Sequence, residues 1–167
     1  VPQMQDAEEV LKALPPPNGR TYLAIVANEK GLERALAAPN LTHVGYPFSL
    51  SETFQQRNTN RSIEASWPLV GAMVERTEGR LGLVGYLSMA FGNPYGDPWS
   101  VEAVLEALAR LKEMGVREIA LADTYGVAEP ERIHEVLKAA AARFGPEGLG
   151  AHLHARPEGA LAKVEAV

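Results

Sequence analysis

The residues best suited to chemistry lie in the stretch Leu149-Gly150-Ala151-His152-Leu153-His154-Ala155. If this stretch is a β-strand, successive side chains alternate between faces, so His152 and His154 point the same way. Their Cβ atoms then lie roughly 6.5–7 Å apart, and two imidazoles at that spacing can converge on one cation at about 2.1 Å each. The alternative is that the pair arose by chance or hydrogen-bonds to backbone. The two histidines therefore predict a metal site, provided that the surrounding elements support one.

Those elements alternate between short apolar runs and longer helical patterns. Strands are expected at residues 21–27, 43–48, 81–89, 118–122 and 149–155. The strand at residues 21–27 is apolar throughout, as strands buried on both faces are. Helices are expected at residues 6–14, 30–38, 62–76, 98–114, 130–144 and 157–167. Residues 49–60 are predicted to form a polar loop, and Asp97 is expected to cap the helix that has Pro98 at its first position.

The regular succession of about five β/α units predicts a parallel sheet with helices outside it, in one of two architectures. An open doubly wound sheet fits the length as a complete domain, whereas a (β/α)8 barrel needs roughly 250 residues, so this chain would be part of one. Length favours the open sheet. Polar residues at the strand ends favour the barrel, and the chain also stops inside a predicted helix, which suggests part of a longer barrel. Among these residues, Asp123 is expected to contribute to a site, with an ordinary strand-end turn as the alternative.

Composition limits the function classes. The chain has 167 residues, of which 46% are hydrophobic and 22% charged, with a formal charge of −5, so residues 1–167 are expected to form a single domain. The sequence has no cluster of Lys and Arg of the kind that binds a nucleic acid or an anionic membrane, which argues against both as partners. Cysteine is absent, which excludes a disulfide, a zinc-thiolate site and a cysteine nucleophile in this sequence. No run approaches a membrane span and the first residues do not form a signal peptide, so a cytoplasmic location is expected.

Several motifs together carry a family resemblance. The runs Ser51-Glu52-Thr53-Phe54, Asn58-Thr59-Asn60 and Ser62-Ile63-Glu64-Ala65-Ser66 resemble the S-E-x-F-x-x-x-N-x-N-x-S-I-x-E-S signature of hydroxymethylglutaryl-CoA lyases. Further matches are Val1-Pro2-Gln3-Met4, Gly85-Tyr86-Leu87-Ser88, Gly92-Asn93-Pro94-Tyr95, Ala122-Asp123-Thr124 and Gly126-Val127. His152-Leu153-His154 falls where that family has its metal-binding H-x-H. Synthases for homocitrate and isopropylmalate share the barrel and the H-x-H, but they lack the Ser-Glu block in this form.

The resemblance implies a (β/α)8 barrel that cleaves 3-hydroxy-3-methylglutaryl-CoA to acetyl-CoA and acetoacetate with a divalent metal, Mg²⁺ or Mn²⁺. By resemblance His152 and His154 are metal ligands, and His152 and Asp123 are catalytic residues. A cation that binds the substrate's alcohol oxygen lowers the pKa of that alcohol. Substrate contacts are expected from Asn58, Asn60, Tyr86 and Ser88, although loop hydrogen bonds for the asparagines and inward packing for the other two are open alternatives. The expected partner is an acyl-CoA substrate, and the number of subunits stays open, a homodimer included.

The sequence also departs from the family pattern. An acidic residue and a Tyr-Gly pair usually follow the H-x-H, whereas Ala155-Arg156-Pro157-Glu158-Gly159 follows it here. The family's first strand with its Arg-Asp pair, and its last strand with a cysteine loop and an asparagine ligand, have no counterpart. The prediction is therefore an incomplete barrel with part of the active site missing. The alternatives are a barrel fragment without activity, or a related acyl-CoA synthase of the homocitrate or isopropylmalate type.

Overall fold

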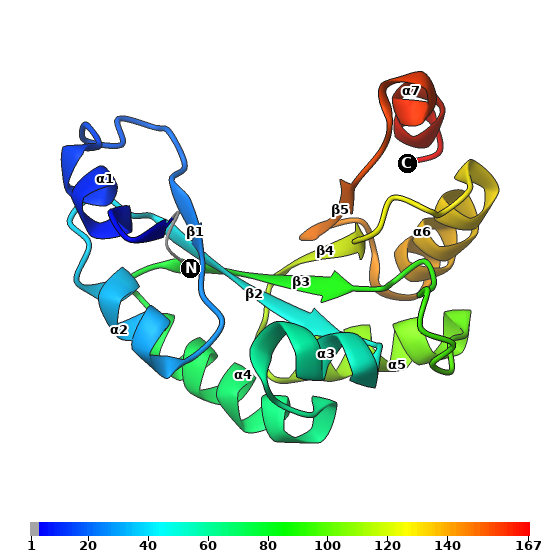
Figure 1. Ribbon diagram of the computed structural model, residues 1–167, viewed down its shortest axis with the longest axis horizontal. Coiled ribbons are helices and arrows are strands. Elements are labelled where there is room, and N and C mark those ends of the chain that lie inside the picture. Colours follow the sequence, from blue (N-terminus) through cyan, green and yellow to red (C-terminus); the bar gives the residue numbers. More distant parts are fainter. Residues whose placement is uncertain (1–3) are drawn as a thin grey trace.

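Five parallel strands form one sheet in which every strand pairs with the next along the chain (Figure 1). The computed structural model describes residues 4–167, so most of the Val1-Pro2-Gln3-Met4 match lies outside the described residues. The strands are β1 (Leu23–Ile25), β2 (His43–Ser49), β3 (Gly82–Ser88), β4 (Glu118–Asp123) and β5 (Leu149–Leu153). The helices are α1 (Ala7–Ala13), α2 (Glu29–Leu36), α3 (Glu52–Thr59), α4 (Ile63–Thr77), α5 (Val101–Glu113), α6 (Pro130–Phe144) and α7 (Pro157–Glu165).

The strand order β1-β2-β3-β4-β5 decides between the two architectures. A doubly wound sheet reverses its strand order at a switch point, and its helices then cover both faces. Here the order never reverses, so successive right-handed crossovers place the helices on one side of a curved sheet. Figure 1 shows this arc, with helices along its outer side and an open inner side. The structure therefore confirms a partial barrel of five strands.

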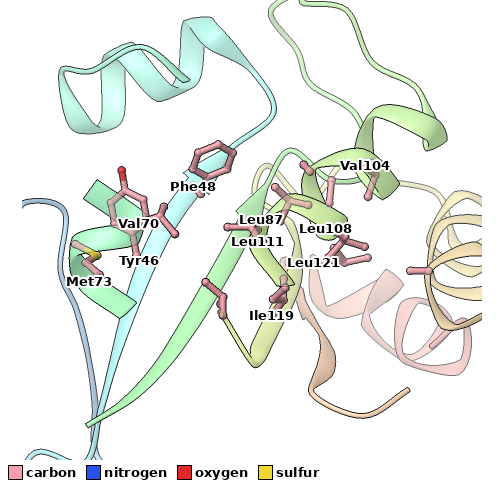
Figure 2. Close-up of a cluster of buried hydrophobic side chains, with 14 of the residues drawn as sticks. Tyr46, Phe48, Val70, Met73, Leu87, Val104, Leu108, Leu111, Ile119 and Leu121 are labelled. Carbon is pink, nitrogen blue, oxygen red and sulfur yellow. The ribbon is translucent and has the colours of Figure 1, made fainter. Parts of the chain in front are cut away.

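The hydrophobic core lies between the sheet and the outer helices (Figure 2). Strand residues alternate between this core and the inner face of the arc. On β4, Ile119 and Leu121 are buried against the helices, and Ala120 and Ala122 take the other direction. Core positions on the helices recur at helical spacing, as Val104, Leu108 and Leu111 do on α5. The side chains of a site are therefore expected on the inner face where the strands end, at the carboxyl ends, as in other barrels.

Strand β1 differs from its expected form. It covers three residues instead of residues 21–27, and Leu23 and Ile25 are 37% and 58% exposed on a strand predicted to be buried on both faces. The physical reason is that β1 pairs only with β2 in the described sheet, and no layer covers its inner face.

Two local predictions after β2 and β3 were wrong. Residues 49–60 contain the helix α3, capped by the Ser51 hydroxyl, which accepts a hydrogen bond from the Phe54 amide. Helix α5 begins at Val101, because Ser100 rather than Asp97 caps it. Asp97 instead accepts hydrogen bonds from the Ser51 hydroxyl and from the amide and hydroxyl of Thr53, which ties the loop after β3 to α3. Within residues 4–167, none of the helices is long and apolar enough to cross a membrane.

Candidate functional site

The histidine pair lies on the inner face at the carboxyl end of β5. His152 is paired in register with Ala122 of β4, and His154 directly follows the strand. The Nε2 atoms of the two rings lie 3.1 Å apart, so both side chains point to the same place, as strand alternation predicts. Both side chains are exposed, and a ligand can therefore reach them.

The ring of His154 is oriented by the backbone of the neighbouring loop. Its Nδ1 lies 2.8 Å from the carbonyl oxygen of Thr124. A carbonyl oxygen can only accept a hydrogen bond, so Nδ1 carries a proton, and in the neutral ring the lone pair is then on Nε2. This is the usual arrangement of a metal-binding histidine, whose second nitrogen donates to a carbonyl or a carboxylate.

His152 favours its neutral form. Partial burial is the larger cause and the neighbouring His154 the smaller one, and both lower the pKa of His152 below its ordinary value of 6.5. A neutral imidazole keeps a free lone pair at neutral pH, which a ligand or a proton acceptor needs. The edge of the His152 ring also packs against Tyr86, with ring centroids 5.4 Å apart.

The distance between the two Nε2 atoms fits one cation. Two nitrogens at about 2.1 Å from an octahedral cation, at right angles to each other, lie about 3.0 Å apart. The observed separation is 3.1 Å. Within residues 4–167, no group of three or more His, Cys, Asp or Glu side chains could hold a metal ion. The described residues thus offer two nitrogen ligands.

Asp123 does not join the histidine pair. It is paired in register with Leu153, one residue along from the Ala122–His152 pair, so its side chain takes the opposite direction, toward the helices. The carboxylate is 3% exposed and accepts hydrogen bonds from Lys163 Nζ at 2.6 Å and from the amides of Val127 and Ala128. The structure therefore does not bring the Asp123 carboxylate next to the histidine rings, and a role for it in supporting a metal or substrate stays a prediction.

The four expected substrate residues divide into two pairs. Tyr86 and Ser88 of β3 share the inner face, and Ser88 pairs in register with Ala122, which in turn pairs with His152. Asn58 and Asn60 follow β2, and β3 and β4 separate β2 from β5, so the structure does not bring them next to the histidines. Asn60 adopts a left-handed conformation (φ 55°) and ends α3, a structural task common for asparagine.

Sequence reasoning missed two features near the ends of the strands. One is Lys163 of α7, whose buried ammonium contacts Asp123. Nothing in the sequence distinguishes this lysine from a solvent-exposed one. The other is an aromatic group of Phe54, Tyr95 and Tyr125, in which the two tyrosine hydroxyls are hydrogen-bonded and the Arg57 guanidinium lies 5.0 Å from the Tyr95 ring. The tyrosines in the loops after β3 and β4 were the available signal for that group.

Comparison with known proteins places this geometry in a family. The HMGL-like family model matches residues 1–166. A hydroxymethylglutaryl-CoA lyase of Bacillus subtilis is 33% identical over 165 residues, which are 98% of this chain and 55% of that protein. The mitochondrial hydroxymethylglutaryl-CoA lyase of Macaca fascicularis is 36% identical over 155 residues, covering 92% of this chain and 47% of the relative.

Solved structures agree with this match. The crystal structure of the Bacillus subtilis HMG-CoA lyase superposes with a TM-score of 0.91 at 33% identity, covering 99% of this chain and 56% of that one. The structure of an HMG-CoA lyase from Acinetobacter baumannii, in complex with coenzyme A and 3-methylmalate, superposes with a TM-score of 0.89 at 27% identity. The match covers 99% of this chain and 55% of that one. The chain thus spans about half the length of the curated relatives it matches. This chain belongs to the HMGL-like family.

Proposed function

We propose that this chain carries the metal-binding H-x-H of a divalent-metal-dependent lyase that cleaves 3-hydroxy-3-methylglutaryl-CoA to acetyl-CoA and acetoacetate. The observation that carries the proposal is the pair of Nε2 atoms 3.1 Å apart on the inner face of a barrel sheet, in a chain of this family. The coenzyme A bound to the Acinetobacter relative supports an acyl-CoA as the substrate.

His152 and His154 would hold the cation through their Nε2 atoms. When bound, Mg²⁺ or Mn²⁺ lowers the pKa of the substrate's tertiary alcohol and holds its oxygens in place. A nitrogen that binds a cation has no lone pair left for a proton, so Nε2 of His152 cannot be ligand and base at once. We assign it to the cation because it lies beside Nε2 of His154. The catalytic proton transfer that we expected of His152 would then require its Nδ1.

The reaction itself balances without a further reactant. The alcohol loses its proton, the bond between C2 and C3 breaks, and the electron pair of that bond leaves on the enolate of acetyl-CoA. The enolate then takes up a proton, and the former alcohol carbon becomes the ketone of acetoacetate. Tyr86 and Ser88 lie on the same face as the pair and would contact the substrate. The buried Asp123 would act on the site only through the residues that it positions.

The test is acetoacetate formation from 3-hydroxy-3-methylglutaryl-CoA with added Mn²⁺, measured through NADH consumption by a coupled 3-hydroxybutyrate dehydrogenase. We expect His154→Ala to lower turnover by more than about a hundredfold, beyond the 10–100-fold typical when a partner behind a ligand is lost. The matched control is His134→Ala, which replaces an exposed histidine on α6. Absence of acetoacetate with the unaltered protein would contradict the proposal and favour a barrel fragment without activity. Citrate-like condensation of acetyl-CoA with a 2-oxo acid would favour a synthase.

A further inference from the structure

Lys163 joins three backbone and side-chain acceptors behind the histidine pair. Its Nζ donates to the Asp123 carboxylate at 2.6 Å, to the Gly126 carbonyl at 2.8 Å and to the His154 carbonyl at 3.0 Å. An ammonium has three hydrogens, so each one has an acceptor. The side chain is only 9% exposed. Helix α7 is thereby tied to the loop after β4 and to the turn after β5.

The loop after β4 is closed around the same carboxylate. The Asp123 carboxylate accepts hydrogen bonds from the amides of Val127 and Ala128, and the Asp123 backbone carbonyl accepts one from the amide of Gly126. Gly126 has φ +70°, and a Cβ there would lie 2.9 Å from the His154 carbonyl oxygen. The loop and the turn at His154 are therefore in direct contact, with the Lys163 ammonium joining them.

This arrangement has a consequence for the ring of His154. Thr124, whose carbonyl oxygen accepts the Nδ1 proton of His154, begins the loop that Asp123 and Lys163 hold. We propose that Lys163 is a positioning residue, which fixes the 124–128 loop against His154 and so selects the imidazole form with the proton on Nδ1 and the lone pair on Nε2. The inference rests on the proposed metal role of the histidine pair, and it concerns a contact that the H-x-H motif does not contain.

The test follows the tautomer of His154 by ¹⁵N NMR of the metal-free protein at pH 8, above the ordinary histidine pKa of about 6.5. We compare Lys163→Met, the double variant Asp123→Asn/Lys163→Met, and Lys138→Met, which replaces an exposed lysine on α6 as a control. The double variant leaves no uncompensated buried charge, so it keeps the test open if Lys163→Met alone does not fold. We expect the Nδ1-protonated form in the unaltered protein and the control.

In both Lys163 variants we expect a mixture of tautomers and at least a tenfold loss of Mn²⁺ affinity. An unchanged tautomer or an unchanged affinity in the folded double variant would overturn the inference. His154→Ala separates this result from a failure of the proposed function. If His154→Ala binds Mn²⁺ as tightly as the unaltered protein, the metal role itself is wrong. If His154→Ala loses Mn²⁺ binding and the double variant retains it, only the role of Lys163 is wrong.

Discussion

Replacement of Lys163 with Met removes one half of a buried ion pair. The side chains of Lys163 and Asp123 are 9% and 3% exposed, and their charged atoms lie 2.6 Å apart. When one partner of a buried pair is removed, the other remains as an uncompensated charge, which typically costs about 3–5 kcal/mol. Because the free energy of unfolding of a domain is about 5–15 kcal/mol, we expect a large fraction of the stability to be lost.

Two comparisons isolate the cause of this loss. The double variant Asp123→Asn/Lys163→Met removes both charges, and we expect it to recover most of the stability, because replacement of a whole buried pair is often near neutral. Arg34→Ala removes a partner of Glu8 in an ion pair whose side chains are 48% and 52% exposed. Exposed pairs contribute about 0–1 kcal/mol, so this variant should unfold almost as the unaltered protein does.

The assay is urea unfolding followed by circular dichroism. With a denaturant slope of about 2 kcal/mol per M, Lys163→Met should lower the urea midpoint by about 1.5–2.5 M, and Arg34→Ala by about 0.5 M or less. If the two variants shifted the midpoint equally, or if the double variant were no more stable than Lys163→Met, the reasoning about the buried pair would be refuted.

Three further predictions concern individual groups. Gly126→Ala should lower the free energy of unfolding more than Gly79→Ala does. Both positions are left-handed (φ +70° and +67°), which costs about 1–2 kcal/mol for alanine, but only at Gly126 would the new Cβ meet the His154 carbonyl. Equal losses in the two variants would count against that contact. An NMR titration of His152 in the metal-free protein should give a midpoint below 6.5. Because the pKa of His152 is lower in the folded state than in the unfolded state, its contribution to folding stability is complete above about pH 6.5 and declines as the pH falls toward the lowered pKa. A titration midpoint above 6.5 would show that burial and His154 do not govern this pKa. Hydrogen bonds from Ser51 and Thr53 lower the pKa of Asp97 below 3.8, so its contribution to folding stability is present above pH 3.8 and declines as the pH falls through the lowered pKa. Asp97→Asn should speed hydrogen exchange at the Thr53 amide, which donates to this carboxylate. An unchanged exchange rate would contradict this role of Asp97.

Much of the architecture could be predicted because it depends on local patterns. The regular spacing of Val104, Leu108 and Leu111 indicated α5, and the alternation around Leu153 placed both histidines on one face. Helix α3 was missed because a polar segment carries no apolar stripe. Its Gln55 is fully buried and hydrogen-bonds Ser49, Thr59 and Ser66, and polar contacts of this kind leave no apolar periodicity in a sequence.

The direction of the Asp123 side chain follows from its place in the strand. Asp123 lies two residues after Leu121, so strict alternation already placed it on the helix-facing side with Leu121. The expectation of a role in the site rests instead on its position at the end of a strand. Its partner Lys163 could not be identified, because a lysine near the end of a helix is usually solvated, and only the packing of α7 buries it here.

The central claim is that His152 and His154 together hold one divalent cation. A titration of the protein with Mn²⁺, followed by the EPR signal of the free ion, tests it most directly in the unaltered protein, His152→Ala, His154→Ala and the control His134→Ala. We expect His152→Ala and His154→Ala each to lose at least tenfold in Mn²⁺ affinity, about 1.4 kcal/mol, and His134→Ala to bind Mn²⁺ as the unaltered protein does. Unchanged Mn²⁺ affinity in both His152→Ala and His154→Ala would contradict the account.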